Sequence, residues 1–183
     1  MNHIEYETKV LNIDPSEIIA KLRELNSQET PEYLEYRMLF DMKTEGTKWV
    51  RVRQENGHTK MTYKYKPADD ESVGSTTEIE VEVSDFKKTT EILEKLGFFY
   101  RSMYQEKKIH IFHYKDIEFS LCTWPKLETY LEIEGPSKEK VAEGLELLGL
   151  QGKDVGDYDV AKLYSPKGID MNASERLSFG ENT

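Results

Sequence analysis

Charged residues recur in this chain in pairs that stand two positions apart. The pairs are Glu5 and Glu7, Arg51 and Arg53, Lys64 and Lys66, and Glu132 and Glu134. Side chains two apart on a β-strand point to the same face, so each pair can act on one ligand. Carboxylate oxygens suit hard divalent cations, whereas guanidinium and ammonium groups suit phosphate oxygens. The spacing therefore predicts a site for a metal ion and a polyphosphate.

The segments that carry these pairs alternate apolar and charged residues, which is typical of strands with one buried face. Seven segments follow this pattern, residues 4–10, 48–53, 60–66, 78–83, 105–114, 117–122 and 130–134, and residues 34–42 form a weaker eighth. A charged face usually lies in solvent. Here, however, the arginine and lysine pairs lie on different strands from the glutamate pairs. This segregation favours strands that close around a charged interior, where opposite charges face one another.

Three amphipathic helices are predicted between the strands. The first begins after the capping residue Asp14, with Pro15 at its first position, and ends near Asn26. The other two span residues 84–97 and 137–149 and end at glycines. Strands and helices together predict an α+β fold in which helices pack outside an antiparallel sheet.

Length and composition limit the classes of protein to which the chain can belong. Its 183 residues suit one domain, which we place at residues 1–167, followed by a tail at residues 168–183 that we expect to be partly mobile. The net charge of -10 would repel nucleic acids and anionic membranes. No apolar run approaches the roughly 20 residues of a membrane span, the N-terminus lacks a leader pattern, and the single cysteine, Cys122, allows no internal disulfide. We expect a cytoplasmic monomer or homodimer that binds a small molecule, and neither nucleic acid nor a membrane.

Residues 5–9, Glu-Tyr-Glu-Thr-Lys, resemble the Glu-x-Glu-x-Lys signature that opens CYTH proteins, the triphosphate tunnel metalloenzymes. In the family's order, this motif is followed by residues 51–53, 64–66, 78–83, 107–108 and 130–135. The resemblance covers roughly residues 1–150. The segment Trp-Pro-Lys-Leu at residues 124–127 is similar to that of class IV adenylyl cyclase-like members, and thiamine triphosphatases are further relatives of this type.

This resemblance implies a closed eight-stranded antiparallel β-barrel, a tunnel that holds a triphosphate and Mg2+ or Mn2+. The metal ligands that it implies are Glu5, Glu7, Glu132 and Glu134. The substrate-binding residues that it implies are Arg51, Arg53, Lys64, Lys66 and Lys108, with Glu78 orienting the basic groups. Lys9 and Glu80 would take part in catalysis, by assisting proton removal. The alternative for the glutamate pairs is an outward-facing, solvated surface.

The chain departs from the family pattern at Cys122. Many relatives have an aspartate before the tryptophan-proline segment, and here Cys122 replaces it. Alternation with Phe119 and Leu121 puts Cys122 on the charged face of its strand. Because a neutral thiol is a poor substitute for an oxygen ligand, the replacement weakens the case for turnover more than the case for ligand binding.

Three functions remain open. Attack by water would make the protein a metal-dependent phosphohydrolase acting on inorganic tripolyphosphate, thiamine triphosphate or a nucleoside triphosphate. Attack by the ribose 3′-hydroxyl of ATP on its α-phosphorus would make it a class IV adenylyl cyclase that forms cyclic AMP and pyrophosphate. The third function is a non-catalytic module that binds a polyphosphate or nucleotide. Because hydrolysis demands less of the site than cyclisation, we expect the phosphohydrolase.

Overall fold

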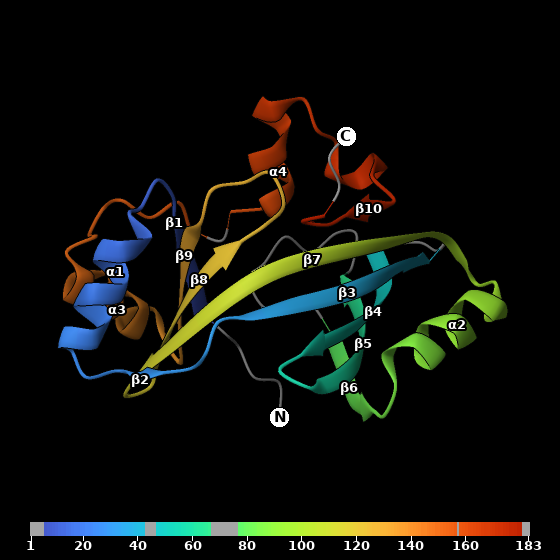
Figure 1. The fold of residues 1–183 in the computed structure, drawn as a ribbon, viewed down its shortest axis with the longest axis horizontal. Helices are drawn as coiled ribbons and strands as arrows, with labels where there is room; N and C mark the ends of the chain where they lie inside the picture. Colours follow the sequence, from blue (N-terminus) through green and yellow to red (C-terminus); the bar gives the residue numbers. More distant parts are fainter. Residues whose placement is uncertain (1–5, 43–46, 67–76, 157, 181–183) are drawn as a thin grey trace. The chain divides into compact units, whose positions relative to one another are not determined.

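The computed structural model describes residues 6–42, 47–66, 77–156 and 158–180. The chain forms two compact units, whose elements are labelled in Figure 1. The first unit comprises Met1–Tyr33 and Lys107–Met171, and the second comprises Leu34–Glu106 and Asn172–Thr183. The long strand β7 (Phe99–Tyr114) has residues in both units.

The first unit also contains β1 (Tyr6–Val10), α1 (Pro15–Glu24), β2 (Gln28–Glu29), β8 (Ile117–Thr123), β9 (Tyr130–Gly135), α3 (Lys138–Leu148), α4 (Val160–Tyr164) and the 3-10 helix η1 (Ser165–Lys167). The second unit contains nearly all of β3 (Tyr33–Met42), with β4 (Thr47–Glu55), β5 (His58–Lys66), β6 (Thr77–Val83), α2 (Phe86–Leu96) and β10 (Arg176–Leu177). The 3-10 helix η2 (Met171–Ala173) lies where the chain passes from the first unit to the second. None of the helices in the described ranges is long and apolar enough to cross a membrane.

Ten strands form the sheet, in the order β1-β9-β8-β7-β3-β4-β5-β6, and the short strands β2 and β10 pair with β7. The described registers are antiparallel, except that β10 runs parallel to β7. The α+β class is therefore confirmed. The closed eight-stranded barrel is wrong, because the sheet has ten strands and, in the described residues, stays open at β1 and β6. Alternation fixes which face a strand buries, whereas closure depends on strand tilt and stagger, which alternation does not encode.

The core of the first unit lies between one face of β1, β9 and β8 and the helices α1 and α3, which lie side by side in Figure 1. Leu22 on α1, Phe119 on β8 and Ile133 on β9 are completely buried there. Gly144 allows α3 to approach the sheet closely, because a Cβ at this position would lie 2.7 Å from Ile133 Cγ2. The apolar positions of the alternating strands are thus used for packing, which leaves their charged positions on the opposite face.

The helices begin and end close to the predicted positions. Helix α1 follows the cap Asp14, and α3 runs from the cap Ser137 to Gly149, which adopts the left-handed conformation with φ 67°. The predicted start of α2 was one residue early. Its cap is Asp85 and not Ser84, since the Asp85 carboxylate accepts a hydrogen bond from a backbone N–H of the first turn at 2.8 Å.

The second unit places β3 to β6 side by side in chain order, with α2 against β4. Phe40 and Val52 are buried on its apolar face, and the rings of Phe40 and Phe99 pack with centroids 5.1 Å apart. On β6, however, Ile79 and Val81 are 64% and 50% exposed. The expected helices outside the sheet therefore cover β1, β8 and β9 but leave the apolar side of β6 open.

Candidate functional site

The second unit gathers basic residues on one face of β3, β4 and β5. Arg53 on β4 stands opposite both Arg37 on β3 and Lys60 on β5. Residues directly opposite on antiparallel strands share a face. Arg51 precedes Arg53 by two positions and Lys64 follows Lys60 by four, so alternation places them on this face as well. We call these five residues the basic face.

Two guanidinium groups of the basic face each keep one nitrogen without an acceptor in the described ranges of the chain, although Arg53 also forms an ion pair with Glu55 at 3.3 Å. The Nε atoms of Arg51 and Arg53 are buried and have no hydrogen-bond partner in the part of the chain that the structure describes. Burial, followed by repulsion from Arg53 and Arg37, lowers the pKa of Arg51 to about 10, although Glu35 and Glu78 offset part of this effect. Arg51 therefore remains charged at neutral pH. A bound anion would supply the acceptors that the described chain does not offer to these two Nε atoms.

Glu78 on β6 holds Lys64. The two residues stand directly opposite each other, and the Lys64 ammonium forms an ion pair with the Glu78 carboxylate. Burial, and next the charge of Arg51, lowers the pKa of Lys64, while the hydrogen bond to Glu78 acts in the opposite direction. Glu78 thus fixes the direction of Lys64 and favours its charged form.

Glu80, two residues further along β6, is surrounded by donors. Its carboxylate accepts a hydrogen bond from Thr62 Oγ1 at 2.9 Å and lies 3.3 Å from Lys60 Nζ and 3.8 Å from Arg53 Nη2. Burial alone would raise the pKa of Glu80, but Thr62, Arg53 and Lys60 together outweigh burial and lower it. A carboxylate held in this way is a weak proton acceptor, so the geometry favours a role in orienting Arg53 and Lys60.

The other two predicted substrate-binding residues are Lys66 and Lys108. Lys66 is the last residue of β5, and its side chain is outside the part of the chain that is described. Lys108 stands opposite Thr123, one position away from Cys122, so it points to the other face of the sheet from Cys122 and Glu132. The structure therefore does not bring Lys108 beside the predicted metal ligands.

The first unit brings three of the four predicted metal ligands to one face. Glu7 on β1 stands opposite Glu134 on β9, and Lys9 stands opposite Glu132. Lys9 is buried, and its ammonium lies 2.9 Å from Glu7 Oε1 and 3.9 Å from Glu132 Oε1. The fourth predicted ligand, Glu5, lies outside the described residues. The predicted catalytic lysine thus serves, in this structure, as a counterion between two of the glutamates.

Glu132 is held at both of its carboxylate oxygens. The Tyr130 hydroxyl donates a hydrogen bond to Oε1 at 3.1 Å, and the Cys122 thiol donates one to Oε2 at 3.3 Å. The indole Nε1–H of Trp124 donates in turn to the Tyr130 hydroxyl at 3.0 Å. Burial, and next the negative charge of Glu132, raises the pKa of Tyr130, so its hydroxyl keeps its proton and remains a donor. We call Trp124, Tyr130, Cys122, Glu132 and Lys9 the Glu132 network.

The spacing of charged residues does not single out Tyr130 or Trp124. A signal for Tyr130 exists in the sequence, because it precedes Glu132 by two positions and therefore shares its face. Trp124 gives no such signal, since its position depends on the turn between β8 and β9. Cys122 lies on the face that alternation predicted, where its thiol binds a carboxylate instead of adding one.

The described residues contain no group of three or more His, Cys, Asp or Glu side chains arranged to hold a metal ion. The chemistry of the donors nevertheless suits a hard cation, because Glu7 and Glu134 present carboxylates from opposite positions on one face. A divalent ion at Glu7 would have to replace the ammonium of Lys9. Glu132 is less available, since both of its oxygens already accept hydrogen bonds.

Comparison with known proteins places these residues in a family. The model of the CYTH domain matches residues 3–157. Among solved structures, the PH1012 protein from Pyrococcus horikoshii OT3 is 24% identical over 82% of this chain and 93% of that chain, with a TM-score of 0.65. A protein from Vibrio parahaemolyticus proposed to be an adenylate cyclase is 12% identical over 91% of this chain and 99% of that chain, with a TM-score of 0.66.

A third similar structure is that of HpAC1 from Hippeastrum, a proposed adenylyl cyclase described as revealing a dominant triphosphatase activity. It is 14% identical over 90% of this chain and 95% of that chain, with a TM-score of 0.56. At these identities, the likenesses to all three structures establish the fold alone. No curated protein matches the chain in sequence.

Proposed function

This chain belongs to the CYTH domain family, and we propose that it is a metal-dependent phosphohydrolase acting on a triphosphate-containing small molecule. The observation that carries the proposal is the pair of buried Nε atoms of Arg51 and Arg53 that lack an acceptor in the described part of the chain. The basic face spans three strands, which at a spacing of about 4.8 Å extend over roughly 10 Å. A single phosphate group is too short to use this length, whereas a chain of phosphates matches it.

The residues of the basic face have separate tasks in this proposal. Arg51 and Arg53 donate their N–H groups to phosphate oxygens, because no protein acceptor in the described residues competes for the buried Nε atoms. Ion pairs with Glu78 and Glu80 orient the ammonium groups of Lys64 and Lys60, respectively. Together they hold the phosphate chain so that water can approach a phosphorus atom in line with the bond that breaks.

Glu7 and Glu134, with Glu5, are the residues that we propose for binding Mg2+ or Mn2+. Such an ion, when bound, neutralises negative charge on phosphate oxygens. Lys9 balances Glu7 and Glu132 in the metal-free protein, because its buried ammonium lies within 4 Å of both carboxylates. The Glu132 network keeps Glu132 fixed beside it.

Binding without turnover is a second candidate, and one observation favours it. Both oxygens of Glu132 are engaged by Tyr130 and Cys122, which leaves this carboxylate poorly available to a metal ion. The basic face could still bind a triphosphate in that case, because its donors do not depend on Glu132.

The test is to incubate the full chain with Mg2+ or Mn2+ and, separately, inorganic tripolyphosphate, thiamine triphosphate and ATP. Orthophosphate release supports the phosphohydrolase, cyclic AMP with pyrophosphate would identify a cyclase, and thermal stabilisation without product would identify a binding module. Neither product nor stabilisation with any of the three compounds would refute both binding and hydrolysis.

Two variants test whether the measured activity depends on the basic face. Arg53→Gln removes charge-assisted hydrogen bonds to phosphate and should lower kcat/KM by about 10- to 100-fold. Arg23→Gln is the matched control, because the Arg23 side chain is 60% exposed and pairs with Glu29 on the first unit. Equal losses in both variants would show that the effect of Arg53 is not specific.

A further inference from the structure

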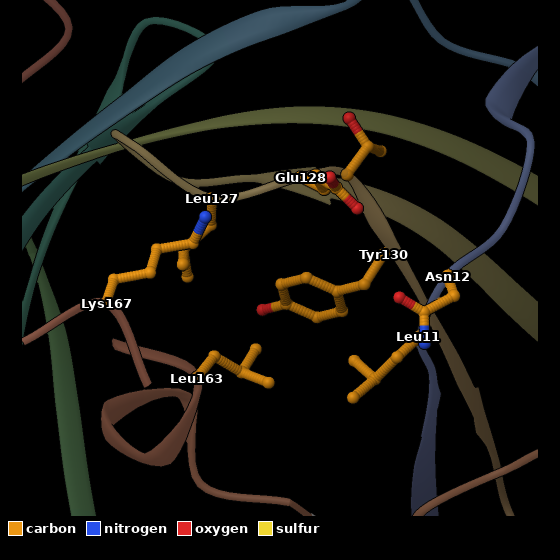
Figure 2. A pocket seen from close by; sticks show the side chains of 8 residues that line it. Leu11, Asn12, Leu127, Glu128, Tyr130, Leu163 and Lys167 are labelled. Carbon is orange, nitrogen blue, oxygen red and sulfur yellow. The ribbon is translucent and has the colours of Figure 1, made fainter. Parts of the chain in front are cut away.

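Each unit contains a buried neutral side chain that holds a charged residue of the candidate site. In the first unit it is Tyr130, whose hydroxyl donates to Glu132 and whose ring forms one wall of a cavity of about 200 Å³ (Figure 2). In the second unit it is Gln105 on β7, which is only 1% exposed. The proposed function assigns no task to Gln105, although Gln105 contacts the basic face through Arg37.

The amide of Gln105 accepts a hydrogen bond from Arg37. The Nε–H of Arg37 donates to the Gln105 amide oxygen at 2.8 Å. On its nitrogen side, the same amide donates to the Sδ atom of Met103 at 3.2 Å, and Met103 is buried as well. Burial of an amide is costly unless its polar atoms are hydrogen-bonded. Both polar atoms of Gln105 meet this condition, so the contact with Arg37 is built into the packing of the second unit.

The backbone at Gln105 is held by the C-terminal strand. Gln105 stands opposite Leu177 of β10, which is buried. One position earlier, the backbone N–H of Tyr104 donates to the carbonyl of Glu175 at 2.9 Å. The amide therefore reaches Arg37 from a backbone that is fixed by strand pairing.

One hydrogen bond at Nε is enough to orient the whole guanidinium group. The group is planar, so the direction of the Nε–H bond also sets the plane in which the two Nη groups lie. A long side chain that is ordered only when its ligand arrives loses rotamer freedom at that moment, which weakens binding. Gln105 orders the Arg37 guanidinium before any ligand binds.

The amide orients Arg37 without cancelling its charge. A carboxylate at the same place would form a charge-assisted ion pair and reduce the attraction of Arg37 for an anion. Glu35 approaches Arg37 only to 3.9 Å, at Nη1. The positive charge of Arg37 is also felt across the basic face, because burial, and then the charges of Arg53 and Arg37, lower the pKa of Arg51.

We propose that Gln105 is a positioning residue of the basic face, whose neutral amide holds the guanidinium of Arg37 in the direction in which Arg37 donates to a phosphate oxygen. The inference rests on the proposed function, because it takes the basic face as the site of phosphate binding. Gln105 acts through Arg37 and needs no contact of its own with the substrate.

Exchange of the Arg37 Nε–H proton with solvent tests the contact in the ligand-free full chain. The signal in proton–nitrogen correlation spectra is assigned by its loss in Arg37→Met. Gln105→Met keeps the approximate volume of the side chain but removes the acceptor, so the proton should exchange at least about 10-fold faster. Gln54→Met is the matched control, because the Gln54 amide accepts from the Tyr36 hydroxyl on the other face of the sheet. It should leave the exchange rate unchanged.

Calorimetric titration with tripolyphosphate tests the consequence for binding. Gln105→Met should weaken binding about 3- to 10-fold, because the Arg37 side chain must then be ordered by the ligand. Arg37→Met should weaken binding about 10- to 100-fold. The two substitutions combined should bind no more weakly than Arg37→Met alone, since Gln105 acts only through Arg37. Gln54→Met should bind as wild type does.

Gln105→Glu separates orientation from charge, and it keeps the inference testable if Gln105→Met does not fold. The carboxylate still accepts from Arg37, so the Nε–H proton should stay protected, while binding of tripolyphosphate should weaken at least about 10-fold because the charge of Arg37 is cancelled. The inference is overturned if Gln105→Met or Gln105→Glu binds tripolyphosphate as wild type does, or if Gln105→Met weakens binding equally with and without Arg37. A wild-type protein that binds no tripolyphosphate would instead refute the proposed function.

Discussion

Replacement of Arg51 by methionine should stabilise the ligand-free protein while weakening its binding of triphosphate. The fall of the Arg51 pKa from its ordinary value to about 10 corresponds, at about 1.4 kcal/mol for each pKa unit, to roughly 3 kcal/mol of unfavourable free energy for the charged form. Methionine removes this unfavourable free energy. Part of the resulting gain in stability is offset, because Glu35 and Glu78 lose a nearby positive charge. We therefore expect Arg51→Met to raise the free energy of unfolding by about 1–2 kcal/mol, and the melting temperature by about 2–8 °C.

The same substitution should remove most of the stabilisation by ligand. Tripolyphosphate at about 100 times its dissociation constant adds about 2.7 kcal/mol to the free energy of unfolding of a protein that binds it only when folded. Loss of charge-assisted hydrogen bonds from Arg51 costs about 1.5–3 kcal/mol of binding free energy. At an unchanged concentration of tripolyphosphate, Arg51→Met should thus keep only about 0.3–1.3 kcal/mol of this stabilisation, as measured by thermal unfolding followed by circular dichroism.

Arg23→Met is the control for this experiment, because Arg23 forms an exposed ion pair with Glu29. It should change the free energy of unfolding by less than about 0.5 kcal/mol and keep the full response to tripolyphosphate. The reasoning is refuted if Arg51→Met is less stable than wild type and responds to tripolyphosphate as strongly. Arg51 would then be a structural residue whose charge is compensated in the folded protein.

Three further changes test other parts of the structure. Glu134→Gln removes one of two like charges that stand opposite each other, so it should raise the free energy of unfolding without metal by up to about 1 kcal/mol while abolishing metal-dependent phosphate release. Gly144→Ala places a Cβ 2.7 Å from Ile133 Cγ2, and should lower the free energy of unfolding by about 1–3 kcal/mol in chemical denaturation. Glu80→Gln should reduce stability at neutral pH but not in acid. The folded pKa of Glu80 is lowered by Thr62 and its basic neighbours, so its stabilising contribution is complete above the ordinary pKa of 4.5 and is lost as the pH falls below that value.

Each of these expectations has an outcome that contradicts it. Full metal-dependent turnover by Glu134→Gln would exclude this carboxylate as a ligand. Gly180→Ala is the control for Gly144→Ala, because a Cβ at Gly180 meets no atom within 4 Å; equal losses would exclude close packing as the cause. A stability difference between wild type and Glu80→Gln that stays constant from neutral to acid pH would show that the carboxylate of Glu80 gains nothing from its neighbours.

Alternation predicted the faces of β4 and β5 because nearly all apolar residues of these strands lie on one side; Trp49, which shares the face of Arg51, is the exception on β4. Val52, for example, is completely buried while Arg51 and Arg53 lie on the opposite face. The same argument fails on β7, where Ile109 and Phe112 are both buried although they point to opposite faces. With apolar residues on both sides, the pattern cannot assign a face to Lys108, and only the pairing with β8 does so.

The contacts within the Glu132 network could not be predicted from the sequence pattern either. Cys122 and Tyr130 stand opposite each other across β8 and β9, so their meeting depends on the register of two strands. That register is set by the turn that joins the strands, and Trp124 lies within this turn. Periodicity within one strand carries no information about such pairing. The sequence could therefore place Cys122 on the charged face, but not as a donor to Glu132.

The Glu-x-Glu-x-Lys spacing explains why the described glutamates form no cluster ready for a metal ion. A period of two puts Glu7 and Lys9 on the same face, and antiparallel pairing sets Lys9 opposite Glu132. The motif thus supplies its own counterion, and the ammonium of Lys9 occupies the space next to Glu7 that a cation would otherwise take. Two neighbouring carboxylates without a countercharge would repel each other and destabilise the fold. Lys9 relieves this repulsion, and any divalent ion that binds Glu7 must compete with it.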